Sequence, residues 1–374
     1  MRKNIVLVIG IILLLAGISM GYFYWKSGGV IDSPAVEKFV FDEKGLVKFD
    51  DWIEKQRADV HADANVANNR NANDANEDME ISFVAVGDMM LSRNVGKKMV
   101  KNGYDYPFEK ITEVISSADL AFGNLESPIL AGDPVNTGSF LFRADEEAAI
   151  SLEKTGFDVL NLANNHVLNM GQEGLINTFA KLNENKMDYC GAGKDSTDDR
   201  ILIRDVKGMK IAFLCYSYGP SEYRVTKNKA GLYINDEEDL IKDLANVKDK
   251  ADFVIVSMHD GIEYEHTSSL RQQNFARSAI DYGADLVIGH HPHVVQEAEV
   301  YKGKYIFYSL GNFIFDQMWS QATREGLAVK FVIGYEGVKK IDFYPVIIED
   351  YSQPRLVDEG ERDKILDYVG LEFD

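Results

Sequence analysis

The stretch that decides the fold is Ala284-Asp285-Leu286-Val287-Ile288-Gly289-His290-His291-Pro292-His293. Its first half is a short, mainly apolar run with the length of a buried strand, and three histidines follow at its end. Because histidine has only an intermediate tendency to be buried, three imidazoles within four positions are hard to explain as packing. We therefore interpret them as metal ligands that stand at the end of a strand.

Other parts of the chain repeat this arrangement, with apolar runs that alternate with helical patterns. One such pattern places Leu175, Phe179 and Leu182 four and then three residues apart, on one face of a helix. Several runs are apolar throughout, as in strands covered on both faces, and the connections are long enough for crossover helices, which indicates an α/β fold. The expected strands are residues 81–87, 119–122, 157–162, 211–216, 253–258, 286–289 and 305–310, followed by a hairpin of 327–334 and 338–348.

Polar donors stand at the ends of these runs, where ligands bind in open α/β sheets. In chain order they are Asp88, Asn124, Glu126, Asn164, Asn165, His166, His259, Asp260, His290, His291, His293 and Asn312. Carboxylate, amide and imidazole donors suit Mn, Fe or Zn, and the lack of cysteine ligands argues against a closed structural zinc site. Taken singly, Asp88 is explained equally well as a helix N-cap, whereas Asn164-Asn165 is more typical of a turn and His259 of a buried core residue. Their convergence favours a site for one or two divalent ions.

The N-terminal residues 1–28 differ sharply from the rest of the chain. Arg2 and Lys3 precede an uncharged run over 5–25, which is about the length that a bilayer core requires. Basic residues before the run and aromatic residues at its end place the N-terminus in the cytoplasm and the remainder outside. We predict a single-pass anchor in the cell membrane, with a cleaved signal peptide as the alternative.

The remaining chain divides by composition into a linker, one domain and a tail. Residues 29–80 form an extracytoplasmic linker, because the low-complexity part 61–78 lacks aromatic residues and cannot bury enough surface to fold. A short amphipathic helix is expected over 39–53. Residues 81–350 form the domain that carries the donors, and residues 351–374 form a C-terminal tail, either helical or mobile.

Charge and cysteine content narrow the classes of partner. The chain has 60 acidic and 40 basic residues and a formal net charge of -20. Phosphate backbones are repelled by such a protein, so nucleic acid is excluded as a partner, whereas metal cations are attracted. The two cysteines, Cys190 and Cys215, are too few for a disulfide framework and could form either one pair or two buried thiols.

The donor motifs together resemble a known family. They are, in order, Asp88, Gly123-Asn-Leu-Glu126, Leu162-Ala-Asn-Asn-His166, His259-Asp-Gly-Ile-Glu-Tyr264, His291-Pro-His-Val-Val-Gln296 and Tyr308-Ser-Leu-Gly-Asn-Phe313. Their order resembles that of the bacterial capsule-synthesis CapA family, the poly-gamma-glutamate biosynthesis proteins, over about 81–348. That family in turn resembles calcineurin-like metallophosphoesterases. The resemblance implies a β-sandwich flanked by helices with a two-metal centre, here behind an N-terminal transmembrane helix.

The resemblance also implies roles for individual residues. Asp88, Glu126, Asn165, His259, His291 and His293 match metal ligands. His166 matches the catalytic residue that stabilises or protonates the leaving group. Met90 replaces an expected histidine ligand and Asn124 an expected aspartate, so Glu126 is the better bridging anion, and one metal position is short of a ligand because a thioether binds hard divalent ions poorly.

Four further residues are predicted to contact the substrate. They are Arg143, Asn124, Glu263 and Tyr264. Arg143 is suited to a carboxylate or phosphate, although a surface ion pair explains it equally well. A solvated loop is the alternative for Glu263 and Tyr264.

The resemblance implies work in the synthesis or export of an anionic surface polymer, together with membrane-bound synthase or export subunits. Two alternatives remain open at this point. One is a free-standing metal-dependent phosphoesterase or amidase, and the other is a non-catalytic scaffold of the polymer-synthesis complex. The sequence does not name the polymer, the bond, the metal or the oligomeric state.

Overall fold

The structure, a computed structural model, describes residues 39–42, 45–48, 79–133, 135 and 140–371, and falls into two units, residues 1–55 and 56–374. In the first unit β1 (Phe39–Asp42) and β2 (Gly45–Lys48) pair antiparallel, so the helix expected over 39–53 is wrong for these strands. The predicted anchor over 1–28 lies outside the described residues. Within the described part, no helix is both long and apolar enough to cross a membrane.

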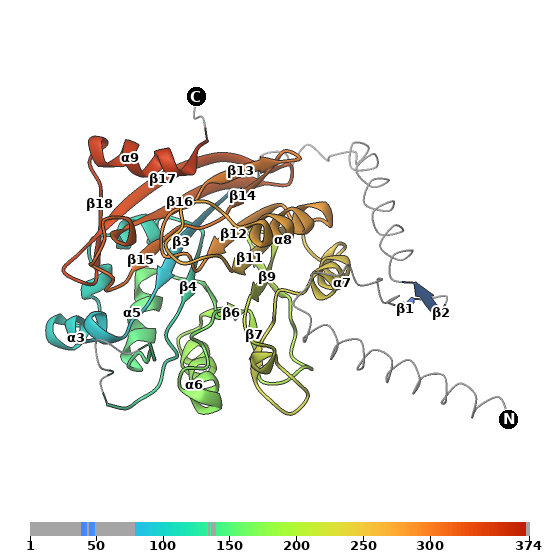
Figure 1. Cartoon of the computed structure of the whole chain (residues 1–374), viewed down its shortest axis with the longest axis horizontal. Helices are drawn as coiled ribbons and strands as arrows, with labels where there is room; N and C mark the ends of the chain where they lie inside the picture. The colour runs from blue at the N-terminus through green and yellow to red at the C-terminus, as the bar shows by residue number, and fades with distance from the viewer. Residues whose placement is uncertain (1–38, 43–44, 49–78, 134, 136–139, 372–374) are drawn as a thin grey trace, which may run out of the picture. The chain divides into compact units, whose positions relative to one another are not determined.

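The second unit is built on two mixed sheets (Figure 1). The larger has the order β18-β17-β16-β3-β4-β5-β6, with β15 beside β3. Its strands are β3 (Ile81–Met89), β4 (Leu120–Leu125), β5 (Val159–Asn161), β6 (Asp188–Cys190), β15 (Asn312–Ile314), β16 (Glu325–Gly334), β17 (Gly337–Glu349) and β18 (Gln353–Leu356). The smaller has the order β13-β14-β12-β11-β9-β8, formed by β8 (Leu202–Val206), β9 (Met209–Ser217), β11 (Phe253–His259), β12 (Leu286–His290), β13 (Ala298–Tyr301) and β14 (Lys304–Phe307). A separate short pair joins β7 (Ala192–Gly193) to β10 (Gly231–Leu232).

The two sheets pack face to face on a shared apolar core. Alternate residues of β3 point to opposite faces of the larger sheet. Phe83 therefore lies in the core between the two sheets, and Val84 lies in the core between the larger sheet and its helices. Phe122 of β4 stacks on Phe213 of β9 across the sandwich, with ring centroids 5.4 Å apart. Burial on both faces explains why these strands are continuous apolar runs in the sequence. The α/β class and the expected strands are confirmed.

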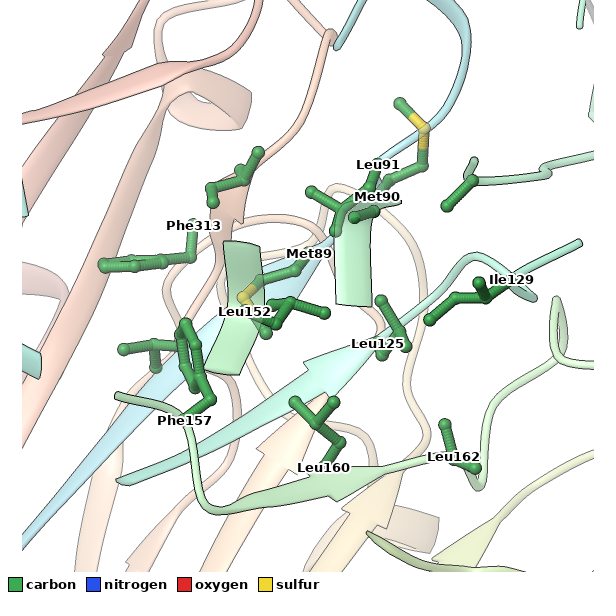
Figure 2. Packing of buried hydrophobic residues seen from close by; sticks show 14 of the residues in the cluster. Met89, Met90, Leu91, Leu125, Ile129, Leu152, Phe157, Leu160, Leu162 and Phe313 are labelled. Carbon is green, nitrogen blue, oxygen red and sulfur yellow. The ribbon is translucent and has the colours of Figure 1, made fainter. Parts of the chain in front are cut away.

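Helices cover the outer faces. Apolar residues of α3 (Arg93–Asn102), α4 (Thr112–Ser116), α5 (Glu147–Thr155) and α6 (Gly171–Glu184) join the core behind the larger sheet. Figure 2 shows this core around Leu125, Leu152 and Leu160. Helices α7 (Glu237–Val247) and α8 (Leu270–Asp281) lie beside β9, β11 and β12 (Figure 1). Short 3-10 turns occur at η1 (Tyr106–Phe108), η2 (Ser221–Tyr223) and η3 (Ala322–Arg324).

The C-terminal residues belong to the folded domain. Strand β18 pairs with β17, and helix α9 (Glu359–Val369) buries Ile365 and Val369 in the core between the sheets. A capping box between Asp358 and Glu361 begins this helix, and Gly370 ends it in a left-handed conformation. Residues 353–369 therefore extend the domain whose end the sequence placed at residue 350.

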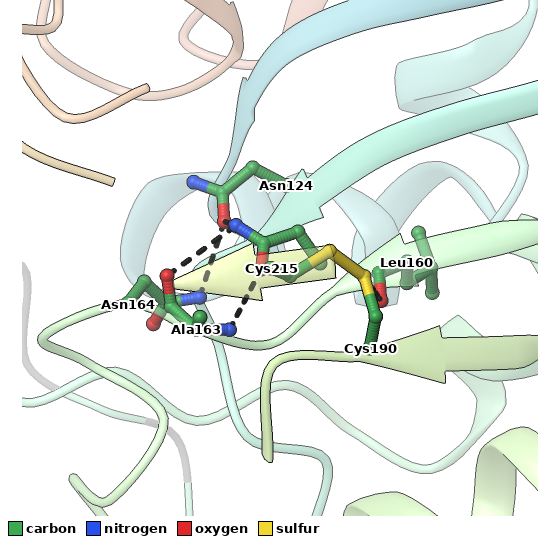
Figure 3. The surroundings of a disulfide bond; sticks show 7 residues. Asn124, Leu160, Ala163, Asn164, Cys190 and Cys215 are labelled. Atoms are coloured by element: carbon green, nitrogen blue, oxygen red, sulfur yellow. Dashed lines mark hydrogen bonds between the residues drawn. A yellow bond between two sulfur atoms is a disulfide. The ribbon is translucent and has the colours of Figure 1, made fainter. Parts of the chain in front are cut away.

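A disulfide connects the two sheets. Cys190 of β6 and Cys215 of β9 are bonded, with their Cα atoms 5.5 Å apart and a separation of 25 positions in sequence (Figure 3). Of the two alternatives that the sequence left open, the structure has the pair.

Candidate metal centre

The first group of donors is a buried cluster of Asp88, Glu126 and His259. Asp88 lies at the end of β3, Glu126 directly after β4 and His259 at the end of β11, so two parallel strands of the larger sheet and one strand of the smaller sheet deliver them. Each offers a ligand atom, and these atoms lie within 4.8 Å of one another. The side chains of Asp88 and Glu126 are fully buried and that of His259 is 1% exposed. Such a convergence of buried donors is typical of a metal site rather than of a solvated acidic patch.

Asn165 completes this cluster. Its Oδ1 lies 3.0 Å from His259 Nε2, and Glu126 Oε1 lies 3.7 Å from the same nitrogen. The rings of His259 and His291 have centroids 4.8 Å apart. The structure therefore brings together Glu126, Asn165, His259 and His291, four of the residues that the resemblance implies as metal ligands. That they bind a metal stays a prediction.

The second group consists of Glu263, His291 and His293, again with ligand atoms within 4.8 Å. His293 Nδ1 lies 3.0 Å from Asn312 Oδ1 and 3.4 Å from Asp88 Oδ2, so Asp88 lies next to both groups. Glu263 is exposed, whereas His293 is buried. The sequence assigned Glu263 to the substrate; the geometry also makes it a candidate ligand.

The backbone of this second group is strained. His291, His293 and the neighbouring Tyr264 have φ angles of 100°, 59° and 68°, which residues other than glycine rarely adopt. Such strain is concentrated at functional sites, where the surrounding structure holds it in place. Gly289 permits the close approach before them, because a Cβ there would lie 2.0 Å from the Tyr308 carbonyl oxygen.

Asn124 is the centre of a hydrogen-bond network under the first group. Its Nδ2 donates to Asp88 Oδ1 at 2.8 Å and to Glu126 Oε1 at 3.2 Å. Its Oδ1 accepts from Asn161 and Asn164 at 3.0 and 3.2 Å (Figure 3). These bonds direct the Asn124 amide to the carboxylates and to its asparagine neighbours. Its contact with the substrate stays a prediction.

Burial and neighbouring charges shift the pKa values of the cluster in different directions. Burial raises the pKa of Glu126 well above its usual range, and the negative charge of Asp88 raises it further. Burial also acts to raise the pKa of Asp88, but hydrogen bonds and charge from His290 and His293 hold it well below its usual range. The pKa of His293 would be lowered by burial, yet Glu126 and Asp88 raise it to about 9.

One buried carboxylate oxygen lacks a hydrogen-bond partner in the part of the chain that the structure describes. Among the described residues, Glu126 Oε2 has no hydrogen-bond partner, and neither has His291 Nδ1. A buried polar atom without a partner costs about 1–3 kcal/mol, and more when it is charged. A divalent ion would satisfy these atoms and offset the charge of two carboxylates, so the residues fit a metal.

His166 lies at the rim of this centre with a fixed orientation. Its Nδ1 lies 3.0 Å from Asn169 Oδ1, and its ring stacks on Phe142 with centroids 4.0 Å apart. Burial lowers the pKa of His166 to about 4, so the imidazole is neutral near pH 7. Asn169, which also accepts a hydrogen bond from the Phe142 backbone, is the positioning residue that the sequence did not indicate.

Met90 is turned away from the donors. Its side chain is fully buried in the core behind the larger sheet (Figure 2), and its sulfur accepts a hydrogen bond from Ser92 N. The position where the resemblance expects a histidine ligand therefore contributes to packing.

Two of the predicted substrate residues have different surroundings. The Arg143 guanidinium donates to the backbone carbonyls of Leu130 and Asp133 and pairs with Asp145 at 2.7 Å. These contacts explain Arg143 as a support of the loop before it, and its role in substrate binding stays a prediction. Tyr264 is 41% exposed and stacks on His293, with ring centroids 6.2 Å apart, so it lines the open side of the centre.

Comparison with known proteins defines the class to which this fold and site belong. Residues 82–317 match the family described as "Bacterial capsule synthesis protein PGA_cap", and the chain belongs to this family. The capsule biosynthesis protein CapA of Bacillus anthracis is 33% identical over 299 residues, which cover 77% of this chain and 72% of that protein. The PGA biosynthesis protein CapA of Bacillus subtilis (strain 168) is 33% identical over 275 residues and 72% of each chain. The resemblance to the CapA family is confirmed.

Solved structures show weaker similarity. A 5'-nucleotidase precursor from Thermus thermophilus has a TM-score of 0.47 at 10% identity, over 78% of this chain and 58% of that chain. The NAD nucleotidase of Haemophilus influenzae has a TM-score of 0.46 at 14% identity, over 78% and 62%. These scores are too low to support a statement on function.

Proposed function

We propose that this protein acts in the synthesis or export of an anionic capsule polymer of the poly-gamma-glutamate type through a divalent-metal, hydrolase-type site. In this proposal residues 1–28 anchor the chain in the cell membrane and the main domain lies outside the cell, next to membrane-bound synthase or export subunits. The buried cluster of Asp88, Glu126 and His259, with its unpartnered carboxylate oxygen, carries the proposal of a metal. Membership of the family supports the polymer.

The residues around the cluster define what the site can do chemically. A bound Mn, Fe or Zn ion would act as a Lewis acid on the bond under attack. In this proposal His166, held by Asn169 and Phe142, faces the leaving group and stabilises or protonates it. Tyr264 and Glu263 line the open side of the metal centre, where in this proposal a polymer chain enters.

Met90 and Asn124 favour a second possibility, a scaffold that has kept the fold and lost the chemistry. Met90 is packed in the core, and Asn124 supplies a neutral amide where the resemblance expects an anionic ligand. Both replacements weaken one of two metal positions. A scaffold would support polymer production without any bound metal.

Elemental analysis of the purified protein separates these possibilities. The parent and a His291→Ala/His293→Ala variant are loaded with Mn, Fe or Zn and dialysed without strong chelator. His266→Ala is the control, because His266 stacks on Tyr368 and binds the Val295 carbonyl outside both donor groups. We expect about one to two equivalents in the parent and in the control, and a clear loss in the double variant. No metal in the parent would refute the metal site.

Complementation in a polymer-producing host tests the biological part. We expect deletion of the gene to change the amount or chain length of the surface polymer, and the parent gene to restore both. Normal polymer after deletion would refute the role in capsule production. Normal restoration by the His291→Ala/His293→Ala gene would leave that role in place and favour the scaffold.

A further inference from the structure

Helix α3 carries positive charge on a strongly acidic protein. Its ten residues include Arg93, Lys97, Lys98 and Lys101 and no acidic residue, whereas the whole chain has a formal net charge of -20. A polyanion is repelled by the average surface of such a protein. A site that receives one therefore needs a local positive region.

The positive residues of α3 line a groove. Arg93, Lys97 and Lys101 are spaced four residues apart, which places them along one face of the helix. They line a cavity of about 190 Å³ together with Leu91, Gly96, Val100 and Arg143. Lys98, outside this face, pairs with Asp350. The opposite wall contains Asp145, whose charge is balanced by Arg143 at 2.7 Å.

The groove begins one side chain away from the candidate metal centre. The Arg93 guanidinium carbon lies 4.7 Å from the ring centroid of Phe142, and this ring stacks on His166. The same carbon lies 5.7 Å from the centroid of Phe315, whose ring contacts His293 at 4.8 Å between centroids. Arg93 is also paired with Asp316, which fixes its position between groove and centre.

We propose that the α3 groove, lined by Arg93, Lys97 and Lys101, binds a stretch of a carboxylate-bearing polymer and guides it to the metal centre. This inference rests on the proposed function and names the substrate contact of that site. An extended polymer with a carboxylate on each unit presents a row of negative charges, which matches a row of cations along a helix. A hollowed groove fits one chain better than it fits a flat membrane surface.

Charge reversal on α3 tests the groove. The full-length protein is compared as parent, Lys97→Glu/Lys101→Glu and the control Lys302→Glu/Lys340→Glu. The control makes the same change in net charge at two exposed lysines of β13–β14 and β17. The probes are sodium poly-gamma-glutamate and vesicles of phosphatidylglycerol. We expect the groove variant to bind the polymer about tenfold more weakly at low salt, with the difference shrinking above about 0.15 M salt.

The control should bind within about twofold of the parent. Equal losses in both double variants would show an effect of net charge alone and overturn the proposal, as would unchanged binding in the groove variant. Binding of vesicles and not of polymer would assign the groove to a membrane surface and overturn it too. If the Glu variant fails to fold, Lys97→Gln/Lys101→Gln replaces it, with the same expectation of weaker binding.

The metal-site variant separates this inference from the proposed function. His291→Ala/His293→Ala should lose metal and keep polymer affinity within about twofold, because the groove contacts lie outside both donor groups. Normal polymer output from this variant would refute the metal-dependent function while the groove result stands. A normal metal site with unchanged binding in Lys97→Glu/Lys101→Glu would refute the groove alone.

Discussion

Replacing Glu126 with glutamine should change stability in opposite directions with and without metal. Glutamine has the same shape, so the hydrogen bond from Asn124 to Oε1 can be retained. In the metal-free protein the substitution removes a fully buried anion beside Asp88 whose second oxygen has no partner among the described residues. A buried polar atom without a partner costs about 1–3 kcal/mol, and more when it is charged, so a neutral group of the same shape should remove part of that cost. Glu126→Gln should therefore be more stable than the parent after metal removal.

Metal should reverse this order. A ligand at about 100 times its Kd stabilises the folded state by about 2.7 kcal/mol, which for a domain of this size raises the Tm by roughly 4–5 °C. The variant has lost one of three buried ligands and should gain little from added Mn or Zn. Thermal unfolding of both proteins, metal-stripped and with metal in excess, measures the two differences.

A surface substitution provides the control. Glu113→Gln on α4 removes the same charge from an exposed position and should leave both Tm values within about 1 °C of the parent. The reasoning is refuted if metal fails to raise the Tm of the parent. It is refuted as well if Glu126→Gln and the parent gain equally from metal.

Three further substitutions test separate parts of the structure. Cys190→Ala/Cys215→Ala removes the link between positions 25 apart and should lower the free energy of unfolding by about 3.5 kcal/mol, seen as a lower denaturation midpoint. A loss below about 1 kcal/mol would contradict a stabilising role of the disulfide between the sheets. His166→Ala should lower turnover at least about 100-fold with unchanged metal content, and loss of metal instead would make His166 a ligand. Arg143→Ala should destabilise the protein by about 1–3 kcal/mol through the freed carbonyls of Leu130 and Asp133, seen as a lower denaturation midpoint; unchanged stability would contradict its role as a support of this loop.

The strands could be predicted because burial on both faces leaves a simple signal. The runs that became β3, β9, β11 and β12 are mainly apolar, and each is bounded by a change of pattern. Short edge strands gave no such signal: β8 alternates between exposed and half-buried residues before Val206. Helix α9 buries only Ile365 and Val369, so its sequence resembles that of a free surface helix.

The donors of the site could be predicted because ligands in α/β sheets bind at the carboxyl ends of the strands. Asp88, Glu126 and His259 follow apolar runs, and the structure places them together. Glu263 could not be placed in this way, since it stands in a loop. The loop is oriented by a hydrogen bond from Tyr264 N to the Pro292 carbonyl, a contact between segments far apart in sequence. The contacts of Arg143 could not be predicted for a related reason, because its carbonyl partners depend on how a loop folds.

The two donor groups differ in burial and charge, and this difference follows from the residues that replace the ligands expected from the resemblance. The first group is fully enclosed and contains two carboxylates, with Asn124 donating to both. The second depends on the exposed Glu263 and on two histidines, while Met90 contributes nothing to it. Because ligand charge and enclosure both strengthen the binding of a divalent ion, the first position should fill at lower metal concentration. One equivalent per chain under limiting metal is the expected result, and equal filling of both positions would contradict this asymmetry.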